Sequence, residues 1–281
     1  MSLLCDLHTH SIFSDGTFTP EQIIDSSIAT GIAAVALTDH NTVDGISRFL
    51  SYAEHKDIDA IAGAEFSVDY EGRELHLLGL FLPEASFPEI SALMINVKKR
   101  KEQSNVDLVE TLARDGFIID YEKIKRSTPN GSVNRAHIAA ELTEKGYTPS
   151  IKAAFSTLLS KAGPYYKEPE RINVFEMIDY IGSIGALSIL AHPFLNLSQE
   201  ELLCFLKKAR GTALAGMECY YSTYTPELQK LSIAIAKDFS LEASGGSDFH
   251  GSNKPDIFLG CGRGDLCVPY SVKKNLESRL K

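Results

Sequence analysis

The feature that most constrains this chain is a short apolar run near its start that ends in two histidines. Residues 3–7 predict a β-strand, and His8 and His10 stand at its end. A strand rises about 3.3 Å per residue and alternates its faces, so the two imidazoles point the same way, roughly 7 Å apart. Two imidazoles at that separation can bind one divalent metal ion. The start of the chain therefore predicts a metal site at the end of a strand.

The same arrangement recurs along the chain. Further apolar runs that predict strands carry His, Asp or Glu at or near one end, at 32–37, 59–64, 75–81, 186–191, 213–218 and 241–245. Predicted helices separate most of these runs, which favours parallel strands joined by right-handed crossovers. In closed barrels of that kind the active site lies at the carboxyl ends of the strands. We therefore expect an α/β barrel of about seven strands with its site at that end.

The polar residues at these strand ends form one set of candidate metal ligands. Its nine members are His8, His10, Asp15, His40, Glu65, His76, His192, Asp248 and His250. One zinc-like ion needs three or four protein ligands, so nine ligands imply two or three metals. The two histidines outside the set are His55, which we expect to be solvated, and His137. The pattern predicts a metal-dependent hydrolase.

The segment 97–171 differs from the rest of the chain. It lacks predicted strands, shows helical periodicity, and carries 14 Lys and Arg against 10 Asp and Glu, whereas the remainder carries 14 against 27. We interpret it as a helical insertion in a barrel formed by 1–96 and 172–281. Its basic character fits either a solvated surface or a surface that binds an anionic substrate.

Composition limits the other possibilities. The chain has 281 residues, enough for one large barrel or two ordinary domains, and a net charge of −9, which argues against general nucleic-acid binding. No apolar run approaches the ~20 residues of a membrane span. Asp6 also interrupts the first apolar run before the apolar region of a signal peptide could form, so we expect a cytoplasmic protein. The five cysteines are an odd number and contain no CxxC pair, so we expect reduced thiols.

Taken together, the motifs resemble those of a known family. The order His-x-His, Asp-Gly, Thr-Asp-His, Glu, His, Ala-His-Pro and Gly-Ser-Asp-Phe-His is similar to the PHP family, named for polymerase and histidinol phosphatase domains. The resemblance implies a distorted, TIM-like (β/α)7 barrel with a trinuclear centre of manganese, iron or zinc. By matching motifs, it implies one metal held by His8, His10, Glu65 and Asp248, a second held by Glu65, His76 and His192, and a third held by Asp15, His40 and His250. Many relatives have His at the position of Asp15, so the third site here is richer in oxygen.

The resemblance also implies phosphoester hydrolysis, in which metals activate a water and neutralise the phosphoryl oxygens. The residues expected to take part in this chemistry are Asp15, His40, Glu65, Asp248 and His250. Asp6 and Asp39 have two open interpretations: they orient imidazoles, or they accept hydrogen bonds from the backbone at strand ends.

The insertion is similar to that of one PHP subgroup, through Asn134-Arg135-Ala136-His137 and Tyr165-Tyr166-Lys167. That subgroup includes 3′,5′-nucleoside bisphosphate phosphatases, some of which also act as 5′–3′ exonucleases on short RNA. This implies a small phosphorylated nucleotide as partner, without a stable nucleic-acid complex, and an insertion that serves as a substrate-binding cap. The substrate-binding candidates are Arg135, whose planar fork suits a phosphate, His137 and Lys167. The oligomeric state stays open.

Three other functions compete with this one. An amidohydrolase-type deaminase also begins with His-x-His on a barrel strand, but it does not need Asp15 and His40 or the final pair Asp248 and His250. A non-catalytic PHP module that serves a polymerase predicts eroded ligands, and here the set is complete. A histidinol phosphatase is the third alternative, against which the long basic insertion argues.

Overall fold

The computed structural model describes residues 3–128 and 133–280. They form two compact units, one made of Met1–Ala92 with Ile172–Lys281 and the other of Leu93–Arg171. We call them the barrel unit and the helical unit. Sequence analysis set the insertion at 97–171, and the structural division falls four residues earlier at its first end. The long helix α3 (Phe87–Arg114) crosses that division.

Eight strands lie in the described part of the barrel unit. They are β1 (Leu4–Asp6), β2 (Ile32–Leu37), β3 (Asp59–Tyr70), β4 (Arg73–Leu80), β5 (Ile172–Asn173), β6 (Leu187–Leu190), β7 (Leu214–Tyr221) and β8 (Glu242–Gly246). Neighbouring strands follow the order β1-β2-β3-β4-β6-β7-β8, and the two-residue β5 pairs with the end of β3.

The two ends of this sheet meet. Leu7 N–H donates to the Gly245 carbonyl at 3.1 Å, and Asp248 N–H donates to the His8 carbonyl at 2.9 Å. An isolated parallel bridge between Thr9 and Phe249 continues the contact. The sheet is therefore a nearly closed barrel, which confirms the predicted distorted α/β barrel.

One part of the predicted topology is wrong, because β4 runs antiparallel to both of its neighbours, β3 and β6. The strand that we expected to end at Glu65 continues to Tyr70 and turns back at Glu71 and Gly72, whose φ angles of 52° and 77° suit a tight hairpin turn. Glu65 therefore lies in the middle of β3. Because β4 is reversed, its first half lies at the end of the barrel where the parallel strands finish.

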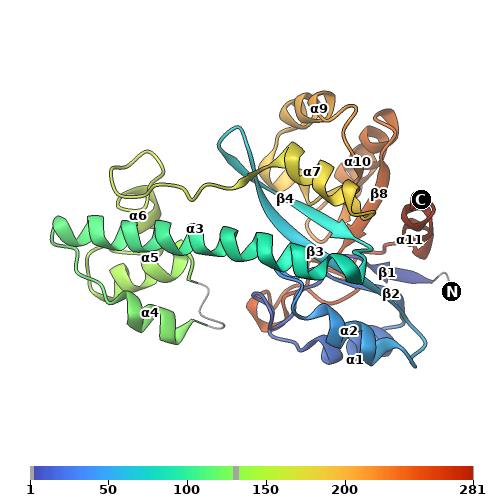
Figure 1. Cartoon of the computed structure of the whole chain (residues 1–281), viewed down its shortest axis with the longest axis horizontal. Helices are drawn as coiled ribbons and strands as arrows, with labels where there is room; N and C mark the ends of the chain where they lie inside the picture. Colours follow the sequence, from blue (N-terminus) through green and yellow to red (C-terminus); the bar gives the residue numbers. More distant parts are fainter. Residues whose placement is uncertain (1–2, 129–132, 281) are drawn as a thin grey trace. The chain divides into compact units, whose positions relative to one another are not determined.

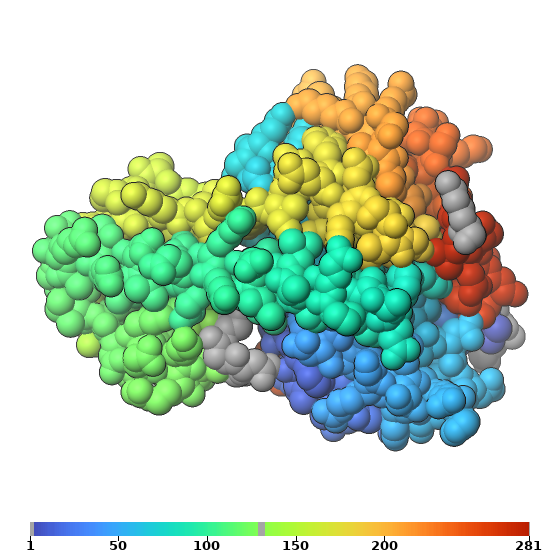
Figure 2. Space-filling model, in the orientation of Figure 1, coloured from blue at the N-terminus to red at the C-terminus, as the bar shows by residue number. Residues whose placement is uncertain are grey.

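Helices cover the outer face of the sheet. Those of the barrel unit are α1 (Pro20–Ala29), α2 (Ile46–Ala53), α7 (Val174–Ser183), α8 (Pro193–Asn196), α9 (Gln199–Lys208), α10 (Pro226–Asp238) and α11 (Tyr270–Glu277), with short 3-10 turns η1 (Glu84–Ser86) and η3 (Gly251–Asn253). Thr19 caps α1, and Pro20 occupies its first turn. In Figure 1 the helices surround the strands, and in Figure 2 their atoms hide most of the sheet from this side.

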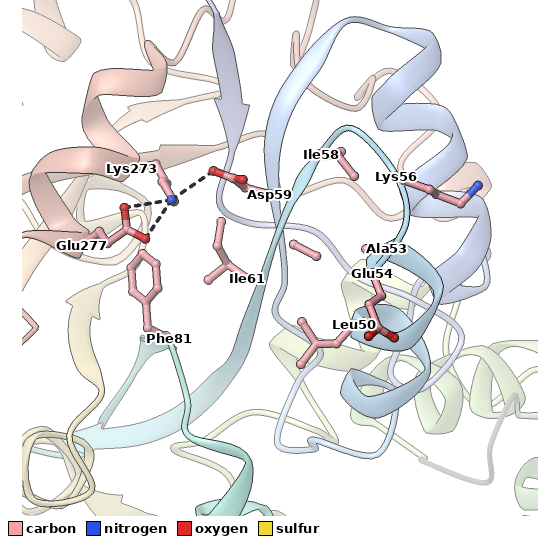
Figure 3. Close-up of a pocket in the computed structure, with 11 residues that line it drawn as sticks. Leu50, Ala53, Glu54, Lys56, Ile58, Asp59, Ile61, Phe81, Lys273 and Glu277 are labelled. Atoms are coloured by element: carbon pink, nitrogen blue, oxygen red, sulfur yellow. Dashed lines mark hydrogen bonds and ion pairs between the residues drawn. The ribbon is translucent and has the colours of Figure 1, made fainter.

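The barrel interior is apolar beneath the polar strand ends, and this apolar core reaches the end where the parallel strands begin. Leu7, Ala36, Leu78 and Ile189 are completely buried in it, and they belong to one cluster with residues of α11. A hollow of about 370 Å³ opens beside this end (Figure 3). Lys273 points into it and pairs with Asp59 at 3.0 Å and with Glu277 at 2.9 Å. Since none of the candidate metal ligands lines this hollow, we assign it a structural role.

The helical unit has a core of its own. Besides most of α3 it contains α4 (Tyr121–Ser127), α5 (Arg135–Glu144) and α6 (Ile151–Ser156). Leu108, Leu112, Ile138, Leu142 and Leu159 are fully buried against one another. Of these helices, α4 has only seven residues, too few to show a clear helical period in the sequence.

None of the described helices is long and apolar enough to cross a membrane. All five cysteines are free thiols, two of them buried.

Candidate metal centre

The strand ends bring the predicted ligands to one place. His8 and His10 follow β1, and their Nε2 atoms lie 3.0 Å apart. Glu65 Oε2 is 3.2 Å from each of these two nitrogens. Asp248, which follows β8, places Oδ1 3.3 Å from His10 Nε2 and 3.6 Å from His8 Nε2. All four side chains are buried, and their donor atoms lie within 4.8 Å of one another, close enough for a single ion.

Glu65 joins this group to further imidazoles. Its Oε1 lies 2.8 Å from His76 Nδ1 and 3.0 Å from His192 Nε2. Its Oε2 also lies 3.1 Å from His40 Nδ1. The contact with His76 follows from the hairpin, because Glu65 pairs with Leu78 and His76 is its diagonal neighbour across the strands. A single carboxylate therefore faces five imidazoles and can bridge two ions.

The third group surrounds Asp15. His250 Nε2 is 3.2 Å from Asp15 Oδ1, while His10 Nδ1 and His40 Nε2 are each 3.8 Å from its carboxylate. His250 Nδ1 lies 2.9 Å from the carbonyl of Asp248, an arrangement that leaves Nε2 free to bind a metal. The structure thus adds His10 to the set of Asp15, His40 and His250.

The charges in this cluster fit positively charged ions. Burial alone would raise the pKa of Glu65, but the surrounding imidazoles hold it well below the ordinary range. Burial lowers the pKa of His40 to about 3, so that ring stays neutral, as a metal ligand must. Burial also opposes protonation of His10 and His76, yet neighbouring carboxylates raise their pKa values to about 9 and about 10. Without metal, protons balance the carboxylates, and divalent cations can replace them.

Two buried atoms support the same conclusion. Glu65 Oε2 lies within 3.2 Å of three imidazole nitrogens but makes no well-aligned hydrogen bond, and His192 Nδ1 has no hydrogen-bond partner. An unsatisfied buried polar atom destabilises a fold by about 1–3 kcal/mol, more when the group is charged. In addition, His192 and Asp248 have the left-handed φ values of 27° and 57°, a strained conformation that is often found at functional sites. The donor set of imidazole nitrogens and carboxylate oxygens therefore fits a group of divalent transition metals.

Comparison with known proteins agrees with this geometry. The PHP domain family matches residues 6–237. The chain belongs to the PHP family. A 5′–3′ exoribonuclease of Haemophilus influenzae is 30% identical to it over 87% of this chain and 89% of its own length. A 3′,5′-nucleoside bisphosphate phosphatase of Chromobacterium violaceum is 26% identical, over 98% of this chain and 97% of its own.

A solved structure supports the fold along the whole chain. It is that of a candidate metal-dependent phosphoesterase from Bifidobacterium adolescentis, 26% identical, with a TM-score of 0.76 over 100% of this chain and 98% of that one. The present chain is accordingly a hydrolase, a metal-dependent phosphoesterase of the PHP family.

Sequence analysis missed one acidic residue of this PHP site, Glu218 on β7. It is completely buried, its Oε1 lies 3.0 Å from His8 Nδ1, and its Oε2 accepts the His192 backbone N–H at 2.7 Å. A hydrogen bond from His8 Nδ1 directs Nε2 of that ring toward the metal group. The available signal was an acidic residue at the end of the apolar run 213–218, the kind of position that the predicted ligands occupy.

Asp6 and Asp39 act on the backbone and on hydroxyl groups. Asp6 accepts hydrogen bonds from the N–H groups of Ser247 and Gly260, each at 2.8 Å. Asp39 accepts Ser11 N–H at 2.7 Å and the hydroxyl of Ser14 at 2.6 Å. Of the two interpretations left open, the structure supports the second for both residues. They fasten the loops on which the ligands stand.

Two further residues contact the PHP centre through Asp248. Its Oδ2 accepts the Tyr221 hydroxyl at 2.7 Å and the Lys254 ammonium at 2.6 Å. Neither was predicted. Tyr221 is the last residue of β7, and the face to which its side chain points depends on the pairing of that strand with its neighbours. Lys254 looks in the sequence like any surface lysine.

The three substrate-binding candidates all lie in the helical unit. The guanidinium carbon of Arg135 is 4.1 Å from the ring centre of Tyr166 and 5.5 Å from that of Phe155. His137 Nδ1 accepts the Asn134 backbone N–H at 3.1 Å, closing a capping box at the start of α5. Lys167 is exposed, and its carbonyl accepts the Ser104 hydroxyl at 2.6 Å.

Proposed function

We propose that this PHP phosphoesterase hydrolyses a phosphate monoester of a small nucleotide, and that its preferred substrate is a 3′,5′-bisphosphonucleotide from which the 3′-phosphate is removed. The observation that carries the phosphoesterase chemistry is the convergence of imidazole and carboxylate donors on Glu65, which faces five histidines at 2.8–3.2 Å. The nucleotide part of the proposal is supported by the bisphosphate phosphatase relative and by the basic helical unit.

We propose two or three divalent ions, with manganese favoured and iron or zinc as alternatives. When bound, such ions supply Lewis acidity: they bring the pKa of water near neutrality and offset the charge on phosphoryl oxygens. Glu65 and Asp248 supply the anionic oxygens that hold positive charges close together. Asp15, with 57% of its side chain exposed, would hold its ion at the solvent side of the group.

The chain's residues also define where substrate enters. His8, His10 and Glu65 are inaccessible to solvent and form the floor of the centre. His40 and His76 keep about a quarter of their side-chain surface exposed, at 25% and 22%, so that the open side lies next to them and Asp15. A phosphate monoester arriving from solvent meets these three residues first.

The helical unit would supply contacts to the second phosphate. Tyr166 and Phe155 lie against the guanidinium of Arg135, an arrangement that restricts the orientation of its planar fork of donors. Because His137 Nδ1 accepts a backbone N–H, its proton is on Nε2, which can donate to a phosphate oxygen as a neutral group. Exposed Lys167 would add a point charge. In these three roles the unit would serve as a substrate-binding cap.

The deciding experiment measures phosphate release by the manganese-loaded protein from a panel of substrates. The panel contains a 3′,5′-bisphosphonucleotide, the two matching monophosphates, a short 5′-phosphorylated RNA and histidinol phosphate. We expect the highest kcat/KM for the bisphosphate, with the 5′-monophosphate as product. The RNA is the second candidate because of the 30% identical exoribonuclease. A preference for RNA or for histidinol phosphate would overturn the bisphosphate assignment.

A further inference from the structure

The two oxygens of Asp248 have different surroundings. Oδ1 faces the metal group, 3.3 Å from His10 Nε2. Oδ2 accepts two hydrogen bonds, at 2.7 Å from the Tyr221 hydroxyl and at 2.6 Å from the Lys254 ammonium. Within the barrel unit as described, Lys254 is the one lysine or arginine that pairs with a candidate metal ligand. A positive charge is thus fixed at the edge of a centre rich in carboxylates.

The backbone that carries Lys254 is held against the loop of Asp15. Asn253 Nδ2 donates to the carbonyl of Asp15 at 2.7 Å, and Ser252 N–H donates to the hydroxyl of Thr17 at 2.9 Å. Gly251 has a φ of 64°, and a Cβ there would lie 2.0 Å from the Thr17 hydroxyl oxygen, so only glycine fits this approach. The position of Lys254 relative to Asp15 is therefore set by the fold.

Exposure places Lys254 on the open side of the centre. Its side chain is 40% exposed, whereas that of Asp248, to which it is bonded, is 7% exposed. Asp15 is the other strongly exposed member of this edge. A lysine ammonium has three N–H donors, and one of them points to Asp248. Because the side chain is 40% exposed, the remaining donors can reach an anion that arrives from solvent.

We propose that Lys254 binds the phosphoryl group of the substrate, donating to a non-bridging oxygen while it keeps its bond to Asp248. The proposal rests on the phosphoesterase function given above, and it names a residue that acts on the phosphate which is cleaved. Lysine binds phosphate as a point charge, so this contact does not depend on the rest of the substrate. Losing a charge-assisted hydrogen bond of this kind should weaken phosphate binding about tenfold to a hundredfold.

The test measures the binding of inorganic phosphate to the full-length, manganese-loaded protein by calorimetry, together with metal content by elemental analysis. For Lys254→Met we expect unchanged metal content, a phosphate Kd that is tenfold to a hundredfold higher, and a raised KM for every phosphate monoester hydrolysed. Lys254→Arg should restore part of the affinity because it keeps the charge. Lys208→Met is the matched control: that lysine pairs with Glu71 at the hairpin turn, and phosphate binding should not change.

Tyr221→Phe separates substrate binding from a purely structural role, because it removes the other hydrogen bond to the same oxygen. If Lys254 only orients Asp248, Lys254→Met and Tyr221→Phe will lower metal content alike and leave the phosphate Kd of the remaining loaded protein unchanged, which would overturn the proposal. Wild-type protein that holds manganese but binds no phosphate would overturn it too. Wild-type protein that binds phosphate through Lys254 yet hydrolyses no nucleotide would contradict only the nucleotide assignment.

Discussion

His8 and Glu218 form a buried pair in which imidazole Nδ1 and carboxylate Oε1 are 3.0 Å apart. The other nitrogen of the same ring lies 3.2 Å from Glu65 and 3.0 Å from His10 Nε2. Because a neutral imidazole carries one proton, a hydrogen bond to Glu218 leaves Nε2 as the metal-binding atom. Glu218 also fixes His192 through its backbone N–H at 2.7 Å. One acidic residue thus sets the orientation of ligands from two strands.

The first prediction concerns this pair. Glu218→Gln keeps the volume of the side chain but removes its charge, so the preference for one imidazole tautomer weakens. We expect metal affinity to fall about tenfold to a hundredfold, the usual effect of losing a partner of this kind. The measurement is a titration of the metal-free protein with manganese. Glu242→Gln is the matched control, because Glu242 is an acid on β8 that pairs with Arg279 instead of with a metal ligand. Equal metal affinity in wild type and Glu218→Gln would contradict the role.

The second prediction concerns the carboxylates that face the metals. Glu65→Gln and Asp248→Asn replace anionic oxygens with neutral amides, which cannot offset the charge of adjacent cations. Removing a residue that only hydrogen-bonds to a metal ligand already lowers metal affinity or activity about tenfold to a hundredfold. Loss of Glu65 or Asp248, which are ligands themselves, should therefore lower kcat by more than about two orders of magnitude. Circular dichroism should show that both variants fold. Near-normal turnover of either purified variant would remove that residue from the site.

The third prediction concerns metal removal. Chelation should abolish phosphate release, and added manganese should restore it. Chelation should also lower the melting temperature, since a ligand at a hundred times its Kd stabilises the native state by about 2.7 kcal/mol. For a chain of this size that corresponds to a shift on the order of 5–10 °C. Differential scanning calorimetry with and without chelator measures the shift. An unchanged melting temperature together with unchanged activity would contradict metal dependence.

Most of the centre could be predicted from the sequence for a local reason. A strand alternates its faces, so His8 and His10 had to point the same way, and parallel strands finish at one end of a barrel. The same reasoning failed where direction depends on distant pairing. An apolar run looks the same whichever way it points. The turn signal at Glu71 and Gly72 alone did not show that β4 is antiparallel to its neighbours or that Glu65 lies in the middle of a strand.

Glu218 and Lys254 show a different limit. Each is a single charged residue whose role depends on which side chain from another part of the chain lies opposite it. Glu218 is 210 residues away from His8 in the sequence. Lys254 is only six residues from Asp248, but the loop between them has no periodicity from which a contact could be inferred.

The fourth prediction concerns the protonation of His137. Burial, together with the charge of Lys101, lowers the pKa of this imidazole from the ordinary 6.5. A lowered pKa means that folding favours the neutral ring, so the stability that its cap gives to α5 is fully present above pH 6.5 and is lost as the pH falls through the lower pKa of the folded protein. NMR titration should report a pKa below 6.5 in the wild type and a higher one in Lys101→Met. A wild-type value above 6.5 would show that the ring does not accept the Asn134 N–H.

The fifth prediction concerns Arg135 and the second phosphate. Its guanidinium lies 4.1 Å from the ring centre of Tyr166, so removing it also removes packing within the helical unit. Arg135→Lys is therefore the sharper substitution, because it keeps a positive charge but loses the planar fork that binds two phosphate oxygens at once. We expect kcat/KM for a 3′,5′-bisphosphonucleotide to fall about tenfold to a hundredfold, and that for a nucleoside 3′-monophosphate to change little.

The control for Arg135 is Arg126→Lys, at an exposed arginine of the same unit, which should affect neither substrate. Melting curves of both variants would show whether the helical unit keeps its stability. An equal loss of kcat/KM for the bisphosphate and the monophosphate in Arg135→Lys would mean that this arginine stabilises the fold or contacts the phosphate that is cleaved. A selective loss on the bisphosphate is expected only if Arg135 grips the phosphate that is not cleaved, because the monophosphate differs from the bisphosphate in that group alone.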